Sequence, residues 1–145
     1  MELALKRIAE NKRTQAKRLD LSDCGLVNEL PEELFECEWL EELDLSGFSY
    51  RYEKRRYEDR NDFSDFSFSN KGFEKLTNLE SLDLSSYHIT DLGFLQGLTS
   101  LQSLNLSYNS ITDISLLQGL INLRSIILRW NYITDIAKAF RKLGQ

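Results

Sequence analysis

The fold is decided by three consecutive copies of one pattern, LTNLESLDLSSYHITDLGFLQG (residues 76–97), LTSLQSLNLSYNSITDISLLQG (98–119) and LINLRSIILRWNYITDIAKAF (120–140). A fixed repeat of 22 residues is typical of a solenoid. Each unit of a solenoid has an apolar edge that is covered only when a neighbouring unit stacks on it. The pattern therefore predicts an extended array of coils, and the broad surface of such an array is suited to binding.

The same frame continues towards the N-terminus. Counted from the first leucine of LxxLxL, the downstream units start at residues 79, 101 and 123, and two more fit at Leu40 and, with alanine in place of leucine, at Ala16. The five starts are separated by 24, 39, 22 and 22 residues, so the second unit is 17 residues longer than those after it. The extra residues lie between Tyr50 and Phe73, and we place the insertion at about residues 51–72.

Around each LxL motif, apolar and polar residues alternate with a period of two. This is the pattern of a short strand with one buried face. In the third unit Leu82 and Leu84 are expected to point inwards, and Ser81, Asp83 and Ser85 outwards. We expect the rest of each unit to return across the other side of the array through turns and short helical pieces.

Both ends of the array carry helical patterns. Leu5, Ile8 and Ala9 fall at helical spacing, which predicts a capping helix over residues 1–15 that covers the first strand. At the far end, Asp135 is a suitable N-cap for a second capping helix over residues 136–145. We therefore predict one domain over residues 1–145, with the repeats at 16–135.

The pattern LxxLxLxxNxIxDIxxL between Leu76 and Ile136 resembles the leucine-rich repeat family in its 22-residue class, as in internalin-like repeats and the leucine-rich regulatory subunit of a protein phosphatase. The stretch ALKRIAENKRTQAKRLDLSDCGL (4–26) resembles the start of leucine-rich domains in Roco-type bacterial proteins. The resemblance implies an α/β fold, a right-handed solenoid of five coils with a short parallel sheet on its concave face. It also implies a non-catalytic module for protein–protein interaction.

The family pattern has an asparagine at the turn after each strand, where the side-chain amide satisfies backbone groups of neighbouring coils. Asn109 and Asn131 stand at this position. Cys24, Phe48 and Tyr87 replace it in the first three coils, so the resemblance implies an asparagine ladder that is interrupted there.

Composition narrows the class of partner. The chain has 145 residues, a formal net charge of -5 and no apolar run that approaches the length of a membrane span, so we expect a soluble, cytoplasmic, monomeric domain with no membrane contact. Acidic residues dominate residues 19–50, which hold ten Asp or Glu and no Lys or Arg, whereas residues 1–18 hold six Lys or Arg and two Glu. A net negative charge argues against nucleic acid and leaves an unidentified protein as the expected partner.

The sequence offers no catalytic, cofactor or metal site. Cys24 and Cys37 fall at repeat positions of the core, so we expect buried structural thiols, and His88 lacks a nucleophile placed to work with it. The acids and amides from Asp59 to Asp65 lack the spacing of a calcium loop and are expected to be solvated turn residues. We therefore predict that the protein is not an enzyme and needs no cofactor.

Candidate partner-binding residues lie on the outward face of the strands, and the columns change character along the array. The face is acidic or small and polar in the first three coils and apolar and basic in the last, and its candidates are Glu42, Asp44, Asp83, Asn105, Ile127, Arg129 and Trp130. Opposed acids on neighbouring strands destabilise a sheet, so we expect the acidic run to serve something other than stability. One interpretation is a strip for a basic partner segment with an apolar anchor at Ile127 and Trp130. The alternatives are a merely hydrated acidic column and an apolar pair covered by the terminal helix.

The insertion is a second candidate, because long ordered loops are commonly functional. Aromatic and basic residues alternate along it, and the candidates for partner contact are Tyr52, Arg55, Arg56, Tyr57 and Phe66. Three interpretations stay open for it: a flap that contacts a protein, a site where single-stranded nucleic acid stacks, and a loop that packs over the array. The alternative functions are accordingly a nucleic-acid or polyanion binder and, as context, a sensor or scaffold domain of a larger bacterial protein.

Overall fold

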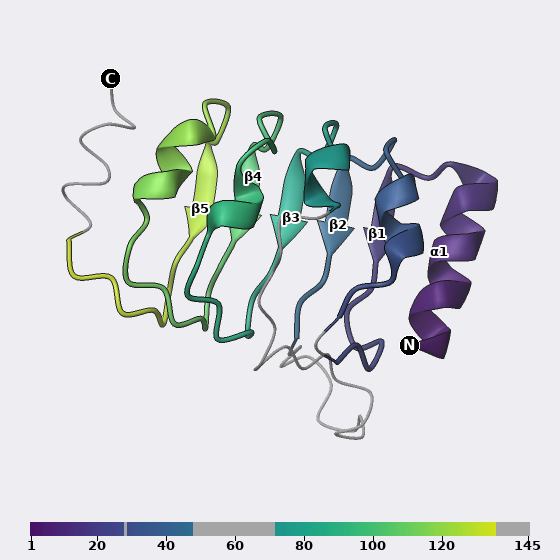
Figure 1. Cartoon of the computed structure of the whole chain (residues 1–145), viewed down its shortest axis with the longest axis horizontal. Helices are drawn as coiled ribbons and strands as arrows, with labels where there is room; N and C mark the ends of the chain where they lie inside the picture. Colours follow the sequence, from purple (N-terminus) through teal and green to yellow (C-terminus); the bar gives the residue numbers. More distant parts are fainter. Residues whose placement is uncertain (28, 48–71, 136–145) are drawn as a thin grey trace.

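The computed structural model describes residues 1–27, 29–47 and 72–135. Three groups of predicted features lie outside the described residues: Phe48 at its turn position, the helix over 136–145, and the insertion candidates Tyr52, Arg55, Arg56, Tyr57 and Phe66. The described part begins with the helix α1 (Glu2–Thr14), which flanks the first strand of a sheet at one end of the molecule (Figure 1).

Within the described residues, five parallel strands form one sheet in sequence order, as the repeat frame predicted. They are β1 (Arg18–Asp20), β2 (Glu42–Asp44), β3 (Ser81–Asp83), β4 (Ser103–Asn105) and β5 (Ser125–Ile127). Short 3₁₀ helices occupy the return segments: η1 (Glu32–Glu36), η3 (Phe73–Lys75), η4 (Gly93–Leu95) and η5 (Ser115–Gly119). Each of the first four coils is thus one strand and one return segment, which confirms the α/β solenoid.

Equivalent residues of successive coils lie side by side. Leu43 of β2 pairs with Leu82 of β3, and Leu82 pairs in turn with Leu104 of β4. The first of these pairs spans the predicted insertion and the second spans a plain 22-residue repeat, yet their geometry is the same. The extra residues therefore leave the strand register intact.

The core is built from the inward positions of the strands and return segments. The four leucines that follow the first four strands (Leu21, Leu45, Leu84 and Leu106) are fully buried. On the return side the buried Phe73 packs against Phe35 and Phe94, with ring centroids 5.5 and 5.2 Å apart. Burying one such side chain stabilises the fold by about 1.5–3 kcal/mol, so stacking of the coils is held mainly by apolar burial.

The helix α1 packs on β1 with a different face from the one that the sequence predicted. Its buried residues are Ala4, Ile8 and Asn11. Leu5 and Ala9, which were expected to be buried with Ile8, are exposed. The burial of Ile8 is confirmed, whereas the prediction for Leu5 and Ala9 was wrong, because the contact with the sheet edge includes a polar residue.

Asn11 is that polar residue. Its Nδ2 donates to the carbonyl oxygens of Ala16 at 3.0 Å and Arg18 at 3.1 Å, and its Oδ1 accepts a hydrogen bond from Trp39 Nε1 at 2.9 Å. The carbonyls of an edge strand must be satisfied when a helix covers them. Asn11 therefore caps the open edge of β1 by hydrogen bonding rather than by apolar contact.

Asn109 joins neighbouring coils through its buried amide. Its Oδ1 accepts hydrogen bonds from the backbone N–H groups of Tyr87 at 3.1 Å and Ile89 at 2.9 Å, and its Nδ2 donates to the carbonyl of Leu84 at 2.9 Å. Asn131 bonds the backbone of the coil before it in the same way. The ladder that the resemblance implied is therefore present in the last two coils.

Candidate partner-binding face

The outward side chains of the sheet form one surface, which we call the open sheet face. Two columns are fixed by the strand register: Arg18, Glu42, Ser81, Ser103, Ser125 and Asp20, Asp44, Asp83, Asn105, Ile127. A third column, Ser22, Ser46, Ser85, Ser107 and Arg129, follows the strand ends at equivalent repeat positions. Ser85 and Ser107 are buried in it, so the expectation that Ser85 points outwards to solvent was wrong. The structure thus brings all of the predicted strand candidates onto one face.

The acidic column has a structural role that the sequence analysis missed. The Oδ1 atom of each of its first four members accepts a hydrogen bond at 2.9–3.1 Å from the backbone N–H two residues further on, in the pairs Asp20 and Ser22, Asp44 and Ser46, Asp83 and Ser85, and Asn105 and Ser107. Short Asp and Asn side chains commonly stabilise turns in this way. The side-chain oxygen therefore holds the turn after each of the first four strands, and Asn105 shows that this role does not need the negative charge.

The acids of the column differ in their further partners. Asp20 lies 3.6 Å from Arg7 Nη1, and Asp83 Oδ2 accepts a hydrogen bond from Asn105 Nδ2 at 2.8 Å. Among the described residues, Asp44 has hydrogen bonds only from Ser46, and it has no ion pair. Asp44 is therefore the acid of the column for which neither a cation nor an amide compensates.

The environment of Asp44 disfavours its charge. Burial raises the pKa of the Asp44 carboxyl, hydrogen bonds from Ser46 lower it, and the neighbouring carboxylates of Asp83 and Asp20 raise it further, with a net shift upwards. Desolvation and like charges both penalise the ionised form of an acid. At neutral pH the folded protein consequently holds a negative charge here at a cost in stability.

Two aromatic side chains stand beyond the ends of β4 and β5. Tyr108 and Trp130 occupy equivalent positions in successive coils, their ring centroids are 5.9 Å apart and their planes differ by 13°. Trp130 is 72% exposed and Tyr108 41% exposed, so most of the indole and much of the phenol face solvent. We call this pair the aromatic shelf. The sequence analysis named Trp130 but missed Tyr108, although Tyr108 lies one repeat length before it.

The backbone at the aromatic shelf is in the left-handed region. The φ angles are 56° at Tyr108 and 57° at Trp130, and the equivalent residues of the first and third coils, Asp23 and Ser86, have φ angles of 51° and 74°. This conformation costs an L-residue with a large side chain about 1–2 kcal/mol, and glycine adopts it freely. The turn itself thus gives no reason for two aromatic side chains.

The last strand extends the apolar surface and changes the charge of the face. Ile127 replaces the acid or amide of the other strands and is 43% exposed, and Tyr132 is 68% exposed. Arg124 and Arg129, which flank β5, are exposed as well. The open sheet face is therefore acidic towards β1–β3 and apolar with basic margins at β5, which agrees with the gradient predicted from the sequence.

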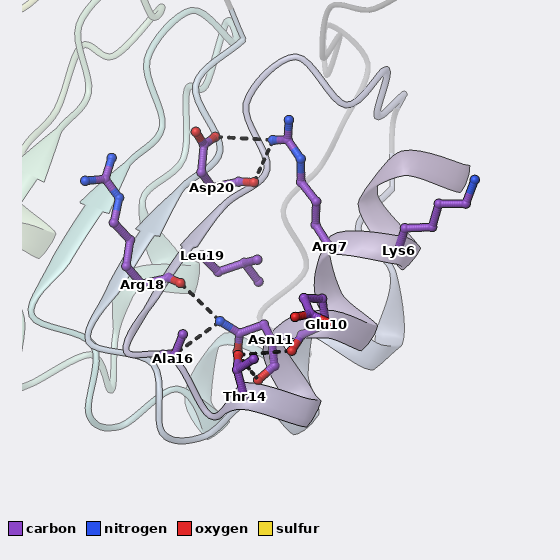
Figure 2. Close-up of a pocket in the computed structure, with 9 residues that line it drawn as sticks. All are labelled: Lys6, Arg7, Glu10, Asn11, Thr14, Ala16, Arg18, Leu19 and Asp20. Carbon is purple, nitrogen blue, oxygen red and sulfur yellow. Dashed lines mark hydrogen bonds and ion pairs between the residues drawn. The ribbon is translucent and has the colours of Figure 1, made fainter.

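A groove of about 430 Å³ lies between α1 and β1 at the other end of the face (Figure 2). Its polar groups are engaged in holding the helix on the strand: Arg7 Nη1 donates to the Asp20 carbonyl at 2.8 Å, and Asn11 bonds the carbonyls of Ala16 and Arg18. The groove is therefore the seam of the N-terminal cap, and its contacts explain it without a ligand.

The two cysteines were predicted to be buried structural thiols, and the single histidine to lack a catalytic partner. Cys24 and Cys37 are buried and form no disulfide with each other, and burial raises the pKa of both thiols, as suits structural cysteines. His88 is exposed at a turn. In residues 1–27, 29–47 and 72–135 there is no group of His, Cys, Asp and Glu suited to a metal ion, and no helix is long and apolar enough to cross a membrane.

Comparison with known families identifies the class of protein. A leucine-rich repeat model matches residues 15–37, a second matches 66–111, and a model of two leucine-rich repeat copies matches 99–142. The chain belongs to the leucine-rich repeat family. Proteins of this fold are typically non-catalytic and generally mediate protein–protein interaction. A comparison with curated protein sequences found no match.

Solved structures with the same fold span a wide range of organisms. Internalin C2 of Listeria monocytogenes is 25% identical, with a TM-score of 0.64 over 88% of this chain and 47% of the internalin. The ectodomain of a plant membrane receptor kinase from Arabidopsis thaliana, solved with CASPARIAN STRIP INTEGRITY FACTOR 2, is 28% identical, with a TM-score of 0.57 over 79% of this chain and 13% of that one.

A third structure is a complex of TLR13 with ssRNA13. It is 27% identical to this chain, with a TM-score of 0.59 over 87% of this chain and 16% of the other. This chain thus spans less than half of the length of each of the three proteins. The plant ectodomain was solved with CASPARIAN STRIP INTEGRITY FACTOR 2 and TLR13 with ssRNA13, so structures of this fold do not share one kind of partner.

Proposed function

We propose that the protein is a non-catalytic protein-binding module that takes its partner on the open sheet face, with Ile127 and the aromatic shelf as the anchor. The observation that carries this proposal is the exposure of Trp130 in a turn that disfavours it. Stability does not account for a side chain that neither packs in the core nor favours the conformation of its own backbone. Trp is strongly enriched among the residues that dominate binding energy.

The apolar surface at β5 supports a protein partner in particular. Interfaces combine an apolar centre with a polar rim, and Arg is enriched in them. Ile127 and Trp130 form such a centre, and Arg124 and Arg129 lie at its margin. We retain a role for the insertion and a cytoplasmic location as parts of the proposal, the second because two cysteines that form no disulfide with each other suit a reducing compartment.

The second candidate is a nucleic-acid binder, which the similarity to the complex with ssRNA13 favours. Aromatic rings beside arginine can stack on bases. Against it stand the acids on the strands next to the shelf and the net charge of -5. Phosphate-driven binding must weaken steeply with salt, so titration of the chain with single-stranded RNA at two salt concentrations separates the two candidates.

A site-resolved cross-linking experiment tests the proposed function. A photo-reactive phenylalanine analogue is placed at Ser103, on the open sheet face, or at Ser115, on η5 of the return side; both serines are exposed. On irradiation in an extract of the source organism, we expect discrete protein adducts from position 103 and none of these from position 115.

Three outcomes would contradict the proposed function. Equal adducts from the two positions would show that the open sheet face is not special, and adducts from position 115 alone would move the site to the return side. Adducts from position 103 that nuclease treatment removes would favour the nucleic-acid candidate.

A further inference from the structure

We propose that the segment bound on this face is an extended peptide stretch with a large apolar side chain on the aromatic shelf and a lysine or arginine at Asp44, four or five residues away. This inference rests on the proposed function and adds the chemistry of the partner. It follows from the apolar character of the shelf, from the charges along the face and from the spacing of the strands.

The shelf selects the apolar part of the segment. Tyr108 and Trp130 present nearly parallel rings on adjacent coils, and Ile127 adds an aliphatic surface in β5. Flat aromatic surfaces bury apolar and aromatic partner side chains at a low entropic cost, since their own rings have few rotatable bonds. One Phe, Leu or similar side chain is thus the complement of the shelf.

The charges of the face indicate that the second residue of the bound segment is basic and that it binds at β2. Arg124 and Arg129 repel a cation at β5, whereas Asp44 offers a carboxylate without a cation or amide partner among the described residues. Asp20 and Asp83 already have such partners, in Arg7 and Asn105. A basic side chain would therefore bind at β2, where it also relieves the repulsion along the acidic column.

The strand spacing sets the distance between the two residues. From β5 to β2 there are three strand intervals. At about 4.8 Å for each interval the span is about 14 Å, and an extended chain advances about 3.4 Å per residue, which gives about four residues. Trp130 lies beyond the end of β5, so it is farther from Asp44 than Ile127 is. A segment whose apolar side chain contacts the indole therefore needs a spacing of five residues. Between Asp44 and Ile127 the same column holds Asp83 and Asn105, whose short side chains bond each other at 2.8 Å and leave room for an extended segment.

The test uses a random dodecapeptide library displayed on phage and selected on the folded full chain. We expect enrichment of peptides in which an aromatic or large aliphatic residue is separated from Lys or Arg by four or five positions. Two variants assign the contacts. Tyr108→Gly with Trp130→Gly removes the shelf at turns that suit glycine, and Asp44→Asn keeps the turn acceptor but removes the charge.

Both variants should fold, which circular dichroism checks. The double glycine variant should lose the apolar preference, and an enriched peptide made by synthesis should bind it at least about tenfold more weakly, as for loss of a hot-spot residue. Asp44→Asn should lose the preference for Lys or Arg while the apolar preference persists.

Several results would overturn the inference. These are enrichment without a preferred spacing, enrichment of acidic peptides, no enrichment at all, and binding that survives in both variants. Adducts at position 103 in the cross-linking experiment, combined with any of these results, would leave the proposed function standing and remove only the inference about the partner segment.

Discussion

The amide of Asn109 offers the sharpest test of how the coils are joined. Asn109→Ala removes an acceptor that serves the N–H groups of Tyr87 and Ile89 and a donor that serves carbonyls of two coils, in a position where the side chain is 4% exposed. Alanine leaves these groups buried beside a cavity. The substitution therefore acts through unsatisfied backbone groups and not through lost apolar contact.

The expected loss can be worked from the two donors. A buried N–H that loses its partner costs about 1–3 kcal/mol, so two of them lower the free energy of unfolding by about 2–6 kcal/mol. A loss of this size is a large part of the free energy of unfolding of a typical domain, which is about 5–15 kcal/mol. The matched control is Asn122→Ala, where an exposed side chain donates one hydrogen bond to the Thr99 carbonyl at 2.7 Å and the expected loss is at most about 1 kcal/mol.

Urea unfolding followed by circular dichroism measures both variants against the parent chain. The midpoint of Asn109→Ala should fall with an unchanged slope, since the slope reports the surface exposed on unfolding. If Asn109→Ala costs no more than Asn122→Ala, the buried amide does not join the coils energetically, and the structural reasoning for the ladder is refuted.

Three further predictions concern single sites. Folding raises the pKa of Asp44, so the folded protein holds this proton more tightly than the unfolded chain, and ionisation of Asp44 lowers the stability as pH rises. Asp44→Asn should therefore raise the urea midpoint near pH 7 and lose that gain below about pH 4. The control is Asp91→Asn, at an exposed acid with a similar turn bond, which should change the midpoint little. Gly72→Ala should destabilise the chain by more than about 2 kcal/mol, because φ is 108° and the new Cβ would clash with the ring of Phe35. Gly119→Ala, with open space around it, should change stability by less than about 1 kcal/mol; thermal melts compare the two. The two buried thiols should resist iodoacetamide in the native chain and react in urea, as mass spectrometry would show, and rapid native labelling would contradict their burial.

The repeat pattern predicted those features that depend on one coil at a time. The alternation around Leu82 and Leu84 sufficed for β3, because the period of a strand decides which side chains point inwards. It failed at α1, where Leu5 was expected to be buried and Asn11 is buried instead. The edge of β1 exposes carbonyls, and apolar periodicity carries no information about where those carbonyls find donors.

The candidate site divides in the same way. Ile127 and Trp130 were predicted as an anchor because each breaks the pattern of its own repeat, and the structure leaves both exposed. Tyr108 was not predicted from the sequence, because nothing within its own coil marks it as a binding residue. Its importance comes from Trp130 in the next coil, and stacking places their rings 5.9 Å apart.

By itself the sequence determined the period, the five strands and the columns of the open sheet face, because the LxL leucines of each unit must stack on those of the next, which permits only one register of the coils. Only the tertiary structure decided which groups find partners. It showed that, among the described residues, Asp20 and Asp83 have a cation or amide partner and Asp44 does not, and that two turns hold aromatic rings side by side. The physical reason is that partners lie one or more coils apart, so their pairing depends on geometry across the stack.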